Sequence, residues 1–314
     1  MYKIFVDGQE GTTGLKIHDF LANRNDLEIL KIDSVDRKNS EKRRILLNEA
    51  DIVFLCLPDS ISKEAVSMIE NNKTRVIDAS TAFRTNKNWV YGLPELNREQ
   101  RELIVHSNRV SVPGCHATGF IIGLYPLIKN QIIPKEYPIT CQSITGYSGG
   151  GKNLIQTYKT GSLQAINSPK HYSLIFSHKH LPEMQHTTGL AYPPIFSPIV
   201  GNFYKGMVTS IPLTIRLLKK RVTAKEICEV LSDYYKDDKF IRIIPYNDES
   251  YLENGFFNAE ECNHTNRTDV FVFGHEEQIM IMTRLDNLGK GSAGAAIQNM
   301  NIMLGLDEAT GLTA

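Results

Sequence analysis

The chain has 314 residues, of which 41% are hydrophobic and 22% charged, as expected for a globular protein with two domains. Lys plus Arg and Asp plus Glu number 35 each, so no net charge attracts nucleic acid or an anionic membrane. No apolar run approaches the ~18 residues of a membrane span. Five cysteines without a Cys-x-x-Cys pair argue against a disulfide framework and a structural zinc site. Because the first residues lack signal-peptide features, we expect a cytoplasmic protein. From the spacing of the cysteines and histidines we expect no metal.

The first element is a short apolar run at residues 3–7, followed by a glycine turn and by apolar residues at helical spacing. The glycines form a Gly-x-x-Gly-x-x-Gly variant of the dinucleotide fingerprint, in which backbone amides at a helix start approach a pyrophosphate. A turn that merely packs the helix against the sheet is the alternative. The predicted cofactor residues in this turn are Gly8, Gly11, Thr12, Thr13 and Gly14.

The next predicted strand, residues 27–32, ends where the adenosine ribose is normally read, roughly 20 residues after the last glycine. Asp33 would bond the 2′-hydroxyl of NAD, whereas Ser34 with Arg37 or Lys38 would hold the 2′-phosphate of NADP. We favour NADP, and Asp33 is the residue that argues for NAD.

Further strands are predicted at residues 50–57 and 75–79, with a helix from Pro58 between them. This alternation indicates a doubly wound parallel sheet whose ligands lie at the carboxyl ends of the strands, so Pro58 joins the cofactor candidates. We expect a loop around Trp89 to Glu95. Arg84 is a candidate for binding an anionic substrate, and a solvated arginine paired with an acid is the alternative.

A strand at residues 104–112 then leads into Val112-Pro113-Gly114-Cys115, with Cys115 at the start of a helix that Pro126 kinks or interrupts. A thiol has an ordinary pKa of about 8.5, and the positive end of a helix lowers it. An inert buried cysteine is the usual alternative. We favour Cys115 as a nucleophile, because it follows a tight turn, starts a helix and has a candidate histidine partner.

After Pro134 strand patterns dominate, which predicts a second domain with a mixed or antiparallel sheet. Thr223 to Glu226 is a capping box that starts a helix through Tyr235, and two strands joined at Gly274 to Glu276 form a hairpin. The expected strands of this domain are residues 138–145, 206–217, 239–244, 268–274 and 277–286.

Three places in this second half carry chemistry. Ser148, Gly149 and Lys152 belong to a glycine-rich segment that can bind an anion through backbone amides, or is a plain turn. No third Cys or His lies close to His178 and His180 in the sequence, so we favour one of the two as the proton carrier for Cys115 over a zinc site. The small residues from Asn287 onward permit close approach to a ligand, and we expect the last helix to return to the first domain.

Five segments together resemble the short form of N-acetyl-γ-glutamyl-phosphate reductase, related to aspartate-semialdehyde and glyceraldehyde-3-phosphate dehydrogenases. The resemblance spans almost the whole chain. It implies an α/β Rossmann domain with a doubly wound parallel sheet plus an α+β catalytic domain, arginine biosynthesis, and reduction by NADPH through a Cys115 thioester. The segments are Gly8 to Gly14, Val112 to Thr118, Thr145 to Lys152, His178 to Glu183 and Asn287 to Gly294.

By this resemblance His180 matches the family histidine and His178 is the second choice, although Leu181 stands where the family usually has Thr. Ser148, Gly149 and Asn287 are assigned to the cofactor, and Arg84 and Lys152 to the substrate. We expect an NADP-binding domain over residues 1–114, completed by a helix over 290–314, and a catalytic domain over 115–289.

Two alternatives remain from the sequence. One is another reductase of the same superfamily, such as the aspartate-semialdehyde type, and the other is an NADP-binding regulator without catalysis. The expected partners are a small-molecule substrate and further copies of the chain, as a dimer or tetramer.

Overall fold

The computed structural model describes residues 1–314, and the chain divides into two compact units. Unit 1 comprises Met1–Gly114 and Ser292–Thr313, and unit 2 comprises Cys115–Gly291 with the terminal Ala314. The chain therefore passes from one unit to the other between Gly114 and Cys115 and passes back between Gly291 and Ser292. No helix is long and apolar enough to span a membrane.

Unit 1 is built on a six-stranded sheet in the order β2-β1-β3-β4-β6-β5, and every pair is parallel. The order reverses at β1, whose neighbours are β2 and β3, so the carboxyl ends of β1 and β3 form a topological switch point. The strands are β1 (Tyr2–Asp7), β2 (Leu27–Leu30), β3 (Ile52–Leu55), β4 (Arg75–Asp78), β5 (Val90–Tyr91) and β6 (Arg109–Ser111). The helices are α1 (Thr12–Leu21), α2 (Ser40–Glu49), α3 (Asp59–Ser67), α4 (Arg98–His106) and α10 (Gly294–Met303).

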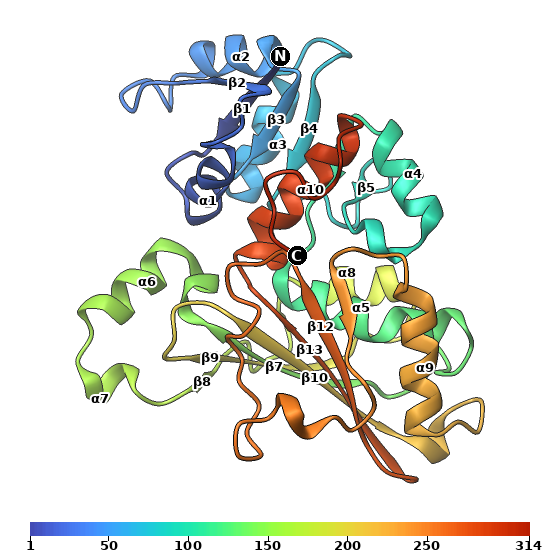
Figure 1. Ribbon diagram of the computed structural model, residues 1–314. Coiled ribbons are helices and arrows are strands. Elements are labelled where there is room, and N and C mark those ends of the chain that lie inside the picture. The colour runs from blue at the N-terminus through green and yellow to red at the C-terminus, as the bar shows by residue number, and fades with distance from the viewer. The chain divides into compact units, whose positions relative to one another are not determined.

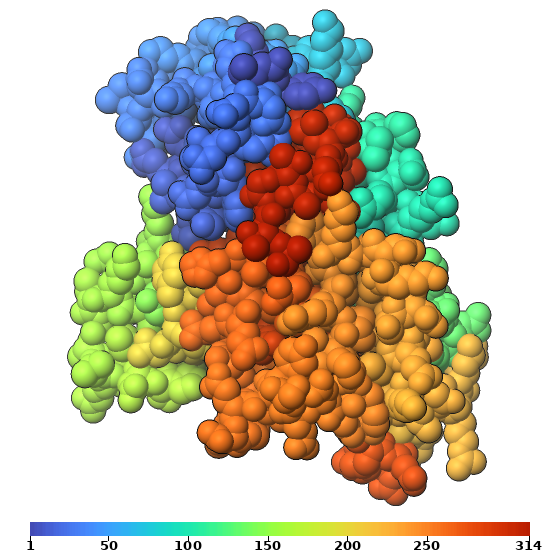
Figure 2. Space-filling view, viewed as in Figure 1, coloured from blue at the N-terminus to red at the C-terminus, as the bar shows by residue number.

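Each face of this sheet has its own core because successive side chains of a strand point to opposite faces. Ile4 and Val6 of β1 belong to a cluster that includes Ile17 of α1 and Ile297 of α10, whereas Phe5 belongs to a second cluster. The red C-terminal segment accordingly lies directly against the blue residues of the first strands and helices (Figure 2).

Unit 2 contains a seven-stranded mixed sheet in the order β11-β12-β13-β10-β7-β9-β8. The β7/β9 and β11/β12 pairs are parallel and the remaining pairs antiparallel. Its strands are β7 (Thr140–Gly146), β8 (Lys170–His171), β9 (Ile195–Gly201), β10 (Met207–Thr214), β11 (Ile241–Ile243), β12 (Thr268–Gly274) and β13 (Gln278–Leu285). Its helices are α5 (Cys115–Lys129), α6 (Gly151–Thr160), α7 (Leu163–Ile166), α8 (Leu181–Thr188) and α9 (Ala224–Tyr235).

Helix α5 lies against β10 and β13, with α8 and α9 beside it (Figure 1). Its close approach to the sheet depends on Gly119, because a β-carbon there would lie 2.6 Å from Thr283 Oγ1 and 2.8 Å from Thr209 Oγ1. Every residue from Phe120 to Leu124 is buried. The sheet thus holds the helix that begins at Cys115.

The predicted fold class is confirmed, as are the capping box at Thr223 and the β12–β13 hairpin. The strand predicted at residues 104–112 is wrong in its first part, because α4 extends to His106 and only Arg109–Ser111 is a strand. The loop expected around Trp89 contains β5, which pairs with β6. Pro126 lies inside α5, which continues to Lys129. Strand β9 was not predicted.

Candidate active site

The glycine turn after β1 lies at the switch point of the unit 1 sheet. Gly8 has a φ of +93°, and a β-carbon on it would lie 2.4 Å from Cys56 O at the end of β3. A β-carbon on Gly14 would lie 2.4 Å from Gly8 O. Only glycine fits these two positions, so the turn brings bare backbone to the start of α1. This is the cradle that a dinucleotide pyrophosphate requires.

The two threonines of this turn differ in their hydrogen bonding. Thr13 Oγ1 lies 3.3 Å from Ser292 Oγ, whereas Thr12 Oγ1 is buried and has no hydrogen-bond partner in the chain. A buried hydroxyl without a partner is costly, and the place of this one in the glycine turn fits a ligand oxygen as its partner. The residues of the turn therefore fit a bound dinucleotide.

The candidates for the adenosine end lie on the segment after β2. Asp33 and Ser34 are exposed, and Arg37 forms an ion pair with Glu10 of the glycine turn. The guanidinium predicted to hold a 2′-phosphate is thus held beside the cofactor turn by a carboxylate. Pro58 is the residue that precedes α3, at the carboxyl end of β3.

Arg84 cross-links two strand ends of unit 1 through its guanidinium. Its Nε donates to Val112 O at 2.9 Å and its Nη2 donates to Ala79 O at 3.2 Å. Arg84, the candidate for binding an anionic substrate, therefore also joins the segments that follow β4 and β6.

Cys115 is the first residue of α5, a helix of 15 residues. Of the five free cysteines, three are buried, and Cys115 and Cys56 are partly exposed. Although Cys56 as a residue is partly exposed, its thiol group is shielded from water, and this desolvation, with the nearby carboxylates of Asp78 and Asp7, raises its pKa and makes it a poor nucleophile. The helix start beside Cys115 favours an anion, because unpaired backbone N–H groups point toward it.

Three imidazoles gather in unit 2. The ring of His116 lies 5.5 Å from that of His178 and 5.6 Å from that of His180, and the rings of His178 and His180 are 4.6 Å apart. All three are buried, and His180 directly precedes α8. The backbone N–H of His180 donates to His178 Nδ1 at 3.1 Å, so a neutral His178 carries its hydrogen on Nε2.

His116, which the sequence did not single out, is a neutral structural imidazole. Burial, with the neighbouring His178 and Lys179, lowers its pKa to about 3. Ser143 donates its hydroxyl hydrogen to Val208 O at 3.1 Å, so His116 Nδ1–H donates to Ser143 Oγ at 2.7 Å.

Tyr172 binds the other nitrogen of the same ring. With the His116 hydrogen on Nδ1, the Tyr172 hydroxyl donates to His116 Nε2 at 2.9 Å. Burial and the nearby Cys115 raise the pKa of Tyr172, which remains a phenol. The only sequence signal for this arrangement is that His116 follows Cys115 directly; nothing in the sequence pointed to Tyr172.

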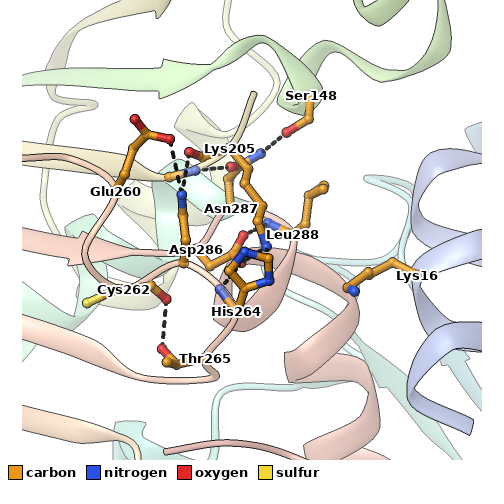
Figure 3. Close-up of polar contacts among 12 residues, drawn as sticks. Lys16, Ser148, Lys205, Glu260, Cys262, His264, Thr265, Asp286, Asn287 and Leu288 are labelled. Atoms are coloured by element: carbon orange, nitrogen blue, oxygen red, sulfur yellow. Dashed lines mark hydrogen bonds and ion pairs between the residues drawn. The ribbon is translucent and has the colours of Figure 1, made fainter. Parts of the chain in front are cut away.

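The glycine-rich segment after β7 and the turn after β13 are joined by a hydrogen bond. Asn287 Nδ2 donates to Ser148 Oγ at 3.0 Å (Figure 3). Asn287 Oδ1 accepts from Gly206 N at 2.8 Å. Gly149 is exposed beside Ser148, and Lys152 is exposed in the first turn of α6. The turn after Asn287 returns to Cys115, since a β-carbon on Gly291 would lie 2.8 Å from Cys115 Cβ.

Comparisons with known proteins agree with this architecture. A sequence profile described as "Semialdehyde dehydrogenase, NAD binding domain" matches residues 3–104, and one described as "Semialdehyde dehydrogenase, dimerisation domain" matches residues 115–287. Two aspartate semialdehyde dehydrogenase structures share the fold at 14% identity. The one from Francisella tularensis has a TM-score of 0.74 over 97% of this chain and 100% of its own, and the one from Vibrio cholerae, complexed with ASA, has 0.71 over 97% and 98%.

The curated relatives narrow the class further. "N-acetyl-gamma-glutamyl-phosphate reductase 2" of Nostoc sp. is 46% identical over 99% of both chains, and the namesake protein of Pseudomonas putida is 40% identical over 98% of both. "N-acetyl-gamma-glutamyl-phosphate reductase" of Trichormus variabilis is 45% identical over 99% of both. The chain belongs to the N-acetyl-γ-glutamyl-phosphate reductase family, within the semialdehyde dehydrogenase class, and is an oxidoreductase.

Proposed function

We propose that this protein reduces N-acetyl-γ-glutamyl phosphate to the γ-semialdehyde with NADPH, releasing phosphate, as a step of arginine biosynthesis. The observation that carries the proposal is the position of Cys115 as the first residue of α5, in the same compact unit as the buried histidine cluster. The names of relatives that match over 99% of the chain supply the substrate.

In the first step the Cys115 thiolate attacks the acyl carbon of the substrate. A carbon–sulfur bond forms, the carbon–oxygen bond to phosphate breaks, and phosphate leaves with the electron pair. The product is a thioester on Cys115. Backbone N–H groups at the start of α5 stabilise the negative charge that develops on the carbonyl oxygen.

The chain holds the cofactor through the glycine turn and through residues near the ribose and nicotinamide. NADPH held there would supply the hydride that reduces the thioester carbon. The partnerless hydroxyl of Thr12 and the Cβ-excluding positions of Gly8 and Gly14 support a pyrophosphate site there. Arg37 serves the 2′-phosphate by exchanging its Glu10 partner for the ligand. The remaining proposed cofactor residues are Gly11, Thr13, Ser34, Pro58, Ser148, Gly149 and Asn287.

His180 handles the proton of the second step. Reduction of the thioester gives a thiohemiacetal oxyanion on Cys115, to which His180 donates a proton. His180 takes that proton back as the carbon–sulfur bond breaks, so that the aldehyde leaves and the thiolate returns. His178, whose Nδ1 accepts the backbone N–H of His180, is the second candidate for this role.

Arg84 and Lys152 are the proposed cations for the phosphate and carboxylate of the substrate. The match of residues 115–287 to a profile described as a dimerisation domain supports a homo-oligomer, and we propose a dimer or a tetramer.

The test is a steady-state assay of the reverse reaction, the phosphate-dependent oxidation of N-acetylglutamate semialdehyde, with NADP and NAD side by side. We expect turnover with NADP and little with aspartate semialdehyde. Cys115→Ser abolishes turnover, whereas Cys228→Ser, a matched thiol on α9, retains it. Full turnover by Cys115→Ser contradicts the mechanism, and preference for aspartate semialdehyde contradicts the substrate. Comparing His180→Asn with His178→Asn assigns the proton carrier.

A further inference from the structure

A buried ion pair joins the loop before β10 to the turn after β13. Strands β10 and β13 are antiparallel neighbours with Met207 opposite Leu285, so Lys205 and Asp286 lie just beyond the same end of this ladder. Lys205 Nζ donates to Asp286 Oδ2 at 2.9 Å, and the two side chains are 10% and 1% exposed (Figure 3). The pair is therefore screened little by water or salt.

Both oxygens of the Asp286 carboxylate accept hydrogen bonds from the backbone. Its Oδ2 also accepts from His264 N at 2.8 Å, and its Oδ1 accepts from Leu288 N at 2.9 Å. Lys205 Nζ lies 3.1 Å from His264 Nδ1 and donates to it as well. A buried carboxylate needs a cation to balance it, and Lys205 is the cation that forms an ion pair with it.

Asp286 directly precedes the turn of residues 287–291, which contacts Cys115. The backbone carbonyl of Asp286 accepts from Gly289 N at 3.1 Å and from Gly291 N at 3.0 Å. Gly291 abuts the nucleophile, since a β-carbon on it would lie 2.8 Å from Cys115 Cβ. Asp286 is thus connected to the side of Cys115 through Gly291.

The same pair also sets the side chain of Asn287. Lys205 directly precedes Gly206, whose N–H donates to Asn287 Oδ1 at 2.8 Å, and Asn287 directly follows Asp286. The ion pair therefore fixes both the backbone that carries Asn287 and the donor that orients its amide. Ser148 Oγ accepts from the other end of that amide.

We infer that Lys205 and Asp286 are positioning residues for the reaction. Their ion pair holds the turn of residues 287–291 in place beside Cys115 and orients the side-chain amide of Asn287. The inference rests on the proposed role of Cys115 as nucleophile. Neither residue touches the reacting atoms, and 81 positions separate them in the sequence.

The test compares Lys205→Met, which keeps the aliphatic chain and removes the charge, with Lys205→Arg, which keeps the charge. Misplacing a reacting group by about 1 Å costs ~100-fold in rate. We expect Lys205→Met to lower kcat by about that factor, to change the KM for NADPH much less, and to speed alkylation of Cys115 by iodoacetamide as the turn loosens. Lys205→Arg should recover most of the kcat.

The matched control is Arg242→Met, which removes an arginine from another buried aspartate, Asp269, in the same sheet. It should leave kcat and the alkylation rate unchanged. If Lys205→Met fails to fold by circular dichroism, Lys205→Met/Asp286→Asn removes both charges, and the same loss of kcat is expected.

Wild-type kcat in Lys205→Met, or in the double variant, would overturn the inference, as would a kcat loss that Lys205→Arg does not recover. The alkylation rate reads the surroundings of Cys115 without turnover. A wild-type enzyme inactive toward N-acetylglutamate semialdehyde therefore contradicts the proposed substrate, whereas unchanged alkylation in Lys205→Met contradicts the positioning role.

Discussion

Gly119 of α5 faces Thr283 of β13 so closely that a β-carbon on the glycine would lie 2.6 Å from the threonine hydroxyl oxygen. Gly119 is one helical turn after Cys115, so this contact brings the first turns of α5 close to the sheet. Thr209 flanks the same glycine from β10.

We therefore expect Gly119→Ala to destabilise the protein by about 1–3 kcal/mol through overpacking, although alanine is the better helix former. Urea unfolding measures the loss. Gly149→Ala is the control, because its nearest neighbour would be 3.4 Å away, an ordinary contact. Equal stability of the Gly119 variant and the wild type would show that α5 can lift off the sheet without cost.

The partnerless hydroxyl of Thr12 predicts opposite effects on stability and on cofactor binding. Thr12→Val keeps the shape and removes the buried hydroxyl, so the cofactor-free protein should be as stable as the wild type or more stable. A hydrogen bond to a charged group is worth about 1.5–3 kcal/mol, so the Kd for NADPH should rise at least ~10-fold. Fluorescence titration and thermal unfolding measure the two effects. Thr13→Val, which loses a hydroxyl that contacts Ser292, serves as the comparison, and unchanged NADPH affinity in Thr12→Val would refute the assignment.

His116 predicts a pH dependence of stability. Its pKa is about 3 in the folded protein, because of burial, and about 6.5 in the unfolded chain. Between these values the unfolded state binds a proton that the folded state does not. The free energy of unfolding therefore falls as the pH drops below 6.5, by up to ~1.4 kcal/mol per pH unit from this residue.

His116→Asn removes this titration and keeps an N–H group that can reach Ser143. Urea unfolding of wild type and variant at pH 7.5, 6 and 5 should show the stability advantage of the wild type shrinking toward acid. A difference that stays constant over this range would mean that His116 is charged in the folded protein or neutral in both states.

The sequence predicted the parallel sheet, the glycine turn and the position of Cys115 at a helix start, because periodicity and turn chemistry are local. The error at residues 104–112 has a local cause as well. Leu103, Ile104 and Val105 look like part of a strand, but Asn97 Oδ1 accepts from Gln100 N and starts a helix, on which only Ile104 is buried.

Other features depend on contacts that no local pattern reveals. Strand β9 contains Pro198, which argues against a strand in the interior of a sheet, yet it pairs with both β7 and β8. Tyr172 binds His116 from 56 positions away in the sequence, and Arg37, which follows β2, forms an ion pair with Glu10 in the glycine turn. Pairs of residues so distant in the sequence can be recognised only once the chain is folded. The residues that carry the proposed chemistry, in contrast, belong to local motifs that the sequence alone reveals.

The contact between Cys115 and Gly291 bears on the evolutionary origin of unit 2. These residues are the first and last of unit 2, apart from the terminal Ala314, and a β-carbon on Gly291 would lie within 2.8 Å of Cys115 Cβ. The two ends of unit 2 therefore meet at one point, which is the layout of a domain inserted into a loop of a host domain. In such a layout Cys115, the buried histidines and the mixed sheet belong to one inserted unit, which a recombination event can transfer as a whole.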